Sequence, residues 1–264
     1  MDPHVLSSGH GIHQGDVCNL DPNGQGVVSA NFSANGDHDS WGWWIPGYAG
    51  TRAIFYSMVK DLAYFIQPDS GPGPGVLVLP SFWGLTSSVK KLADDLADEG
   101  HTVLVPDLNF GVLPDSEEDA VKHLEEANPD RLASLVLSSG ALLAGKASGD
   151  SIAILGSGMG GSLALWASVR LHSIVDRAVS FYGTQQIDFA GSNARYQIHL
   201  AETDDYITQD EVDFMEATMG LEELEVDIHV YAGTAHGFAE PEGGSFDESA
   251  RDLARSRTMA FLAS

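Results

Sequence analysis

From about residue 52 onward, short apolar runs alternate with segments whose apolar residues recur at helical spacing. The run Val76–Pro80 is typical of a buried strand, whereas 86–99 places Val89, Leu92 and Leu96 on one face of a helix. The same reading predicts further strands at 102–105, 151–155, 178–181, 197–200 and 225–231, a short antiparallel pair at 53–58 and 62–67, and helices at 116–127, 129–144, 159–171, 208–219 and 248–262.

This alternation predicts the fold class. Short apolar strands separated by amphipathic helices favour an α/β protein with a mostly parallel sheet covered on both faces, that is, a three-layer α/β/α sandwich. We expect residues 52–264 to form one such domain. Residues 1–51 differ: the first 50 contain nine glycines and five aspartates but no Lys or Arg, which indicates an irregular extension.

The extension contains two features with a possible function, a group of tryptophans and several histidines. Trp41, Trp43 and Trp44 lie within four residues, and they would serve either as a lid over a pocket or as an anchoring patch on the main domain. Histidines also occur there, among them His4, His10 and His13, but no cysteine or carboxylate falls at a recognisable ligand spacing, so we predict no metal site. The one cysteine, Cys18, excludes an internal disulfide and a cysteine-rich cluster.

Charge narrows the choice of partners. The 13 basic and 38 acidic residues give a formal net charge of −25. A polyanion such as DNA would be repelled, and anionic membrane surfaces are disfavoured for the same reason. No apolar run reaches the length of a membrane span and no secretory signal is recognised, so we expect a cytoplasmic protein. The acidic, lysine-poor composition also suits a saline interior, where salt screens self-repulsion.

Chemistry-bearing residues gather where the predicted strands end, which is where parallel sheets place their sites. Three loops of this kind are a glycine-rich turn, an acidic turn and a histidine turn, in that chain order, which is the order of a hydrolase triad. Before them comes an aromatic loop. In sequence these loops are Pro80-Ser81-Phe82-Trp83-Gly84-Leu85, Gly156-Ser157-Gly158-Met159-Gly160-Gly161-Ser162, Ala201-Glu202-Thr203-Asp204-Asp205 and Ala232-Gly233-Thr234-Ala235-His236-Gly237-Phe238.

The glycine-rich turn also admits a dinucleotide-binding interpretation. Gly156, Gly158 and Gly161 match the spacing G-x-G-x-x-G, and a strand-to-helix turn can hold phosphate. However, the turn comes late in the chain, and the stretch near residue 180 lacks the acidic residue that would bind a ribose. We therefore expect no dinucleotide cofactor.

Taken together, these stretches resemble the dienelactone hydrolase family of the α/β-hydrolase fold. The resemblance runs from about Ala63 to Ala260, roughly 200 residues, and leaves the first 50 without a counterpart. The matching stretches are Pro72–Leu85, Ala97–Leu108, Ile154–Leu165, Ala178–Gly183, Ala201–Ile207 and Tyr231–Ala239.

The resemblance implies a role for each matching residue. His236 corresponds to the family's catalytic base and Asp204 to the acid that orients it, with the adjacent Asp205 as the fallback. The backbone N–H groups of Phe82 and Met159 correspond to the oxyanion hole. The implied reaction is cofactor-free hydrolysis of a small carboxylic ester or lactone.

The chain departs from the family at the nucleophile. Aligning the flanking Gly156 and Gly160 puts Gly158, which has no side chain, where family members carry Cys or Ser. Ser157 is a substitute of low probability because its register loses both glycines. Ser162 is weaker still, since it lies in the first turn of the following helix.

Two further departures bear on the substrate. Ser81 stands where the founding enzymes place a glutamate, and Glu240 stands where they place an arginine that binds the substrate carboxylate. An anionic dienelactone would therefore meet like charge. Phe82 and Trp83, with the tryptophans of the extension, indicate either an apolar pocket wall or ordinary core.

Three functions stay open on sequence alone. The chain is a hydrolase whose activity is impaired or water-mediated, a non-catalytic family member that binds a small ligand, or a partner-binding protein that uses the tryptophan-rich extension. The sequence does not determine its oligomeric state.

Overall fold

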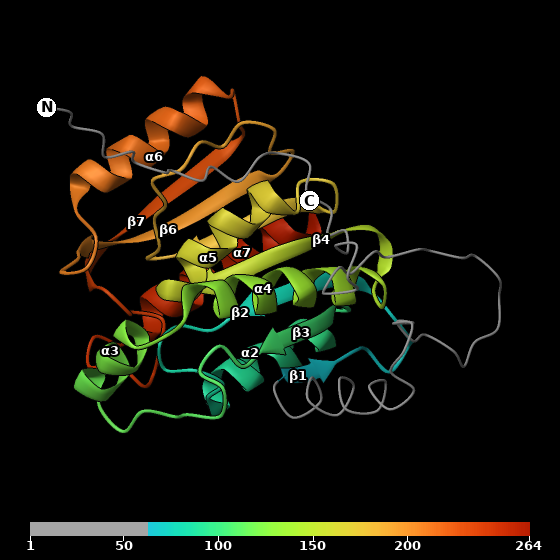
Figure 1. Ribbon diagram of the computed structural model, residues 1–264, viewed down its shortest axis with the longest axis horizontal. Coiled ribbons are helices and arrows are strands. Elements are labelled where there is room, and N and C mark those ends of the chain that lie inside the picture. Colours follow the sequence, from blue (N-terminus) through green and yellow to red (C-terminus); the bar gives the residue numbers. More distant parts are fainter. Residues whose placement is uncertain (1–62) are drawn as a thin grey trace, which may run out of the picture. The chain divides into compact units, whose positions relative to one another are not determined.

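The computed structural model describes residues 63–264, which form a seven-stranded sheet with helices on both faces (Figure 1). The predicted three-layer fold is thereby confirmed. The strands are β1 (Ala63–Ile66), β2 (Pro74–Leu79), β3 (Thr102–Pro106), β4 (Ser148–Ser157), β5 (Val175–Phe181), β6 (Arg195–Thr203) and β7 (Val226–Ala235). The helices are α2 (Ser87–Asp98), α3 (Glu117–Glu125), α4 (Pro129–Ala144), α5 (Met159–Arg170), α6 (Gln209–Leu221) and α7 (Glu248–Ala263).

The strand order is β1-β3-β2-β4-β5-β6-β7, with β1 antiparallel to β3 and every other pair parallel. The predicted antiparallel partner of β1, residues 53–58, lies outside the described residues, as do the extension, its tryptophans and its histidines. The parallel pairing matters for function because it brings the carboxyl ends of β2, β4, β5, β6 and β7 to one edge of the sheet.

Alternate residues of the strands build two separate cores. In β2, Leu77 and Leu79 join a core with α4, α5 and α6, whereas Val76 and Val78 join a second core with α2 and α7. This alternation follows from the pleat, which sends successive side chains to opposite faces. Because both faces are covered, the strands read as continuous apolar runs.

Several strand boundaries differ from the sequence prediction. We expected strands at 151–155, 197–200 and 225–231, but β4, β6 and β7 are each longer, and β7 continues to Ala235. The reason is pairing: Thr203 of β6 is still in register with Ala235 of β7, past an irregularity at Ala201. Asp204 and His236 therefore each follow directly on the last residue of a strand.

Candidate active site

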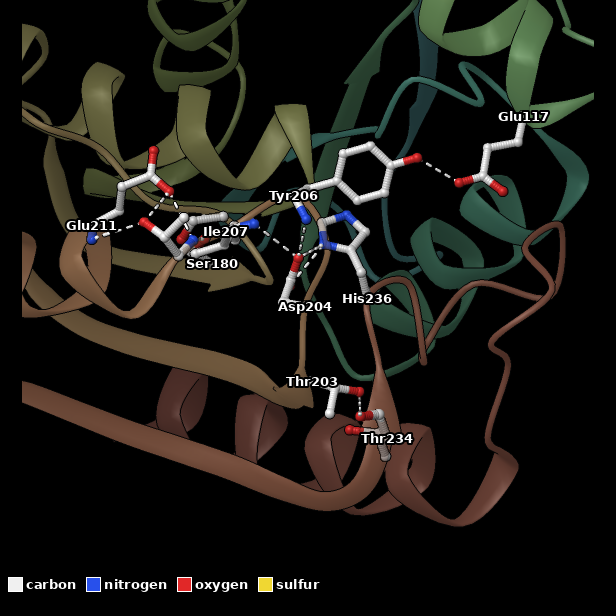
Figure 2. A network of polar contacts seen from close by, with 11 residues as sticks. Glu117, Ser180, Thr203, Asp204, Tyr206, Ile207, Glu211, Thr234 and His236 are labelled. Carbon is white, nitrogen blue, oxygen red and sulfur yellow. Dashed lines mark hydrogen bonds and ion pairs between the residues drawn. The ribbon is translucent and has the colours of Figure 1, made fainter.

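Asp204 and His236 meet at the shared edge of β6 and β7. The two carboxylate oxygens of Asp204 lie 2.9 and 2.8 Å from Nδ1 of His236, and both side chains are largely buried, at 10% and 16% exposed. Asp204 Oδ1 also accepts the backbone N–H groups of Tyr206 and Ile207, at 2.8 and 3.0 Å (Figure 2). With its carboxylate held in this way, Asp204 accepts a hydrogen bond from the Nδ1–H group and leaves Nε2 of His236 available as a base.

The turn after Asp204 leads directly into α6. Thr208 caps this helix and forms a reciprocal capping box with Glu211, which fixes the loop between β6 and α6. Asp204 is thus held by its own backbone turn and by the helix start behind it. The fallback residue Asp205 is exposed and forms no hydrogen bond with His236 among the described residues.

The glycine-rich turn has the backbone of a nucleophile elbow. Gly158 follows β4, has φ of 52° and ψ of −118°, and is the N-cap residue of α5. A Cβ on Gly156 would come within 2.0 Å of the Gly160 carbonyl oxygen, and one on Gly160 within 2.1 Å of the Leu79 carbonyl oxygen. Both flanking positions therefore require glycine, which supports the register predicted from sequence.

Position 158 faces the histidine. A Cβ built on Gly158 would lie 3.7 Å from Nε2 of His236 and 3.6 Å from Cβ of Ser81, both ordinary contact distances. A side chain at this position would fit without a clash and would point at the base. A non-glycine residue at position 158 would nevertheless strain the backbone, because a positive φ costs such a residue about 1–3 kcal/mol.

The alternative serines are placed differently. Ser157 is the last residue of β4 and faces the buried hydroxyl of Tyr182. Ser162 lies in α5, where its backbone N–H donates to the Gly158 carbonyl oxygen at 3.0 Å. Neither serine has a hydrogen bond to His236 among residues 63–264, so of positions 157, 158 and 162 the structure brings 158 to the base.

The two expected oxyanion donors come from neighbouring strands, because Leu79 of β2 is in register with Gly156 of β4. Met159 is the first residue of α5, where the N–H groups of a helix are free and its dipole favours negative charge. Phe82 is fixed by the Asn109 side chain, which donates to the Phe82 carbonyl oxygen at 2.7 Å. These loops lie side by side at the end of the sheet.

Aromatic rings border His236. Tyr206 and Tyr182 place their ring centroids 4.7 and 4.9 Å from the imidazole, and Phe82 lies 6.3 Å from Tyr206. The Tyr206 hydroxyl donates to Glu117 of α3, as Figure 2 shows, and this bond raises the pKa of Tyr206 to about 12. Sequence reasoning missed both tyrosines and Glu117; the only signal was that each tyrosine follows a strand end.

Glu240 and Ser81 lie beside the histidine. Ser81 is fully buried, and the Glu240 carboxyl group faces Ser81, Tyr182 and His236. Burial raises the pKa of Glu240 to about 7, and the nearby Glu242 acts in the same direction. The residues that the sequence marked as departures from the family thus stand in the site itself.

Two cavities in the described domain lie away from these residues. One of about 440 Å³ lies between α2 and α7, and one of about 270 Å³ lies at the amino ends of β2 and β4. His236, Asp204 and Gly158 line neither of them. Within residues 63–264 no cluster of three metal-ligating side chains occurs, and no helix combines the length and apolarity needed to cross a bilayer.

Comparison with known proteins now assigns the family. The model of the dienelactone hydrolase family matches residues 62–264. The chain belongs to this family. Among curated relatives, the protein usf of Aquifex pyrophilus is 29% identical over 216 residues, covering 77% of this chain and 93% of that protein. Carboxymethylenebutenolidase 1 of Cupriavidus pinatubonensis is 25% identical over 218 residues, covering 76% and 90%.

Solved structures agree on the fold. The dienelactone hydrolase-like promiscuous phosphotriesterase P91 from metagenomic libraries has a TM-score of 0.65 at 19% identity, covering 76% of this chain and 91% of its own. At that identity the likeness shows the α/β-hydrolase fold and no more. The fold and family expected from the motifs are thus confirmed, whereas the roles of the individual residues rest on the geometry above.

Proposed function

We propose that this dienelactone hydrolase family member hydrolyses a small carboxylic ester or lactone without a covalent enzyme intermediate, using His236 as general base for water. The observation that supports this proposal is the position of Gly158, whose absent side chain leaves room directly in front of Nε2 of His236. A water molecule fits the chemistry of that position, because it would replace the hydroxyl or thiol that other family members carry.

The reaction balances with the residues present. His236 Nε2 takes one proton from the water as its oxygen bonds to the carbonyl carbon, and Asp204 stabilises the resulting imidazolium. The N–H groups of Phe82 and Met159 stabilise the negative charge that develops on the carbonyl oxygen. Collapse of this intermediate breaks the bond to the leaving oxygen, which takes the proton back from His236.

We expect this route to be slow. In hydrolases that lose one triad member, binding and the oxyanion hole still leave an acceleration of about 10³–10⁴-fold over water. The proposal therefore predicts measurable but modest turnover. A cytoplasmic location and the lack of a nucleic-acid partner remain predictions from composition and charge.

The test is hydrolysis of short-chain p-nitrophenyl esters, at low and high KCl, by the full chain and by His236→Ala. General base catalysis is worth about 10²–10⁴-fold, so we expect the variant to lose at least about a hundredfold in kcat/KM. His172→Ala, which removes an exposed histidine from the turn after α5, is the matched control and should keep full activity. Equal rates for the unaltered chain and His236→Ala would refute the mechanism.

A second function is favoured by the same glycine. Because Gly158 removes the nucleophile but leaves the rest of the site assembled, the chain would also suit a non-catalytic role as a binder of small ligands. That reading predicts background hydrolysis by every variant, together with thermal stabilisation by a ligand of roughly RT ln(1 + [L]/Kd). The partner-binding reading depends on residues outside the described part of the chain.

A further inference from the structure

A partly buried carboxyl group, that of Glu240, stands beside the base, and the reaction proposed above does not use it. Glu240 lies in the loop after β7, where its N–H donates to the Gly237 carbonyl oxygen at 2.9 Å and its carbonyl oxygen accepts from Gly243 at 3.1 Å. These two bonds hold Glu240 in the segment that also carries His236. The backbone of Glu240 is therefore fixed close to the base.

The polar surroundings of Glu240 are incomplete. Its carboxyl group faces Ser81 from the loop after β2, Tyr182 from the end of β5, and His236 and Glu242 from its own loop. The Tyr182 hydroxyl is fully buried, yet no described residue gives it a well-formed hydrogen bond. Tyr182 also has φ of 37°, unusual for a non-glycine residue, and such strain is often found at functional sites.

Aromatic rings line the same region. Phe82 and Trp83 pack edge to face with centroids 5.3 Å apart, and Phe82 packs edge to face on Tyr206 at 6.3 Å. The indole nitrogen of Trp83 lies 4.0 Å from a Cβ built on Gly243, so Trp83 reaches the loop that holds Glu240. The faces of aromatic rings attract cations, an effect worth about 0.5–2 kcal/mol.

Several carboxylates act on these groups. The charge of Glu242 acts on Glu240, and the charges of Glu117, Asp205 and Asp204 act on Tyr206. The arginines with well-defined acidic partners lie elsewhere: Arg255 pairs with Asp95, and Arg195 with Glu225. An anionic ligand would meet repulsion and a cation would be steered inward.

We propose that this site selects ligands that carry a positively charged ammonium group, with Glu240 as the counter-ion and the rings of Phe82, Trp83 and Tyr206 in contact with the cation. As a statement about substrate it rests on the proposed function, and the preferred substrates are then cationic esters. As a statement about binding it stands alone. A cation beside Glu240 would also offset the cost of ionising a carboxyl group in this partly desolvated position.

The test compares two alcohols of the same shape that differ in one charge. Choline and 3,3-dimethylbutan-1-ol are titrated into the full chain by calorimetry at pH 8 and 50 mM salt. We expect choline to bind at least tenfold more tightly in the unaltered chain, and this ratio to fall below about threefold in Glu240→Gln. Glu222→Gln, at the far end of α6, removes the same charge and should keep the ratio.

The pH dependence of choline binding gives a second test of the proposal. With a carboxyl pKa of about 7, Glu240 is ionised at pH 8 and mostly protonated at pH 6, so the preference for choline should shrink on acidification. The groups facing this carboxyl are Ser81, Tyr182, His236 and Glu242. Glu240→Gln removes the contribution of this carboxyl alone, so the loss of preference on acidification should be much smaller in that variant.

Three results would overturn the proposal: equal binding of the two alcohols, tighter binding of 3,3-dimethylbutanoate than of choline, or no saturable binding of choline up to about 50 mM. Turnover is measured separately with the acetate esters of both alcohols. Choline selectivity without hydrolysis would refute the proposed reaction only, whereas hydrolysis without selectivity would refute the cationic specificity only.

Discussion

Two histidines on one pair of neighbouring strands have opposite environments. His236 follows β7 at the edge of the sheet, is 16% exposed, and has a carboxylate as its partner. His199 lies within β6, is completely buried, and is bonded to neutral groups: Tyr231 at 2.7 Å, Gln197 at 3.0 Å and Thr258 at 3.1 Å.

The environment of His199 keeps its ring neutral. Burial lowers its pKa to about 3, and the positive charges of His229 and Arg257 act in the same direction. Because the Gln197 oxygen can only accept, Nε2 of His199 donates to it and Nδ1 accepts from the Tyr231 hydroxyl. The ring also stacks on Phe181 at 4.3 Å between centroids. Both nitrogens are in use, so His199 serves the core, whereas His236 keeps one nitrogen for chemistry.

The largest expected effect tests whether His236 is positioned to act as a base. Gly158→Ser would supply a nucleophile in front of His236, and in a well-studied hydrolase loss of the serine costs about 10⁶-fold in kcat. We expect at least a hundredfold rise in p-nitrophenyl ester hydrolysis with a pre-steady-state burst, at a stability cost of about 1–3 kcal/mol. Adding His236→Ala should abolish the gain. A Gly158→Ser protein that folds and shows no gain would mean that His236 is not positioned as a base.

The next effect falls on the core. His199→Ala would leave Gln197, Tyr231 and Thr258 without their partner and remove the stacked ring, so we expect the free energy of unfolding to fall by about 2–4 kcal/mol. Urea unfolding measures this loss, and His236→Ala should change stability by under about 1 kcal/mol. A folded His199→Ala variant should keep its ester turnover per native molecule. Loss of turnover without loss of stability would reverse the roles assigned to the two histidines.

The smallest effect is a pH dependence of stability carried by His199. Its pKa is about 3 in the folded protein and 6.5 in the unfolded chain, so only the unfolded state takes up a proton between these values. Stability from this group is complete above pH 6.5 and falls on acidification, by about 2 kcal/mol at pH 5. Urea unfolding at pH 7 and pH 5 measures the loss, and His199→Asn should remove most of it. An unchanged loss in that variant would exclude His199 as its source.

The motifs of the site could be predicted from the sequence because each is a short local segment. The order of the glycine-rich, acidic and histidine turns, and their places after apolar runs, follow from the printed sequence, and the structure brings Asp204 and His236 within hydrogen-bonding distance. The register of the elbow was also readable, since close backbone packing at Gly156 and Gly160 admits no side chain.

The residues that sequence reasoning missed share a different property. Tyr182, Tyr206 and Glu117 reach the site from three separate segments, and nothing in their local pattern sets them apart from core or surface residues. Their roles come from distances across the fold, such as the contact of the Tyr206 ring with His236. The extended ends of β6 and β7 were missed for a similar reason, because a strand lasts as long as its neighbour continues to pair with it.

The sequence by itself determined the α/β architecture and the family, and it predicted Gly158 at the nucleophile position, because each of these depends on spacing along the chain. Only the tertiary structure decided what surrounds that position: which histidine keeps a nitrogen without a described partner, and that the partly buried Glu240 lies next to it. Burial and the choice of partner are set by segments distant in sequence, and these two quantities govern the charge state of every group in the site.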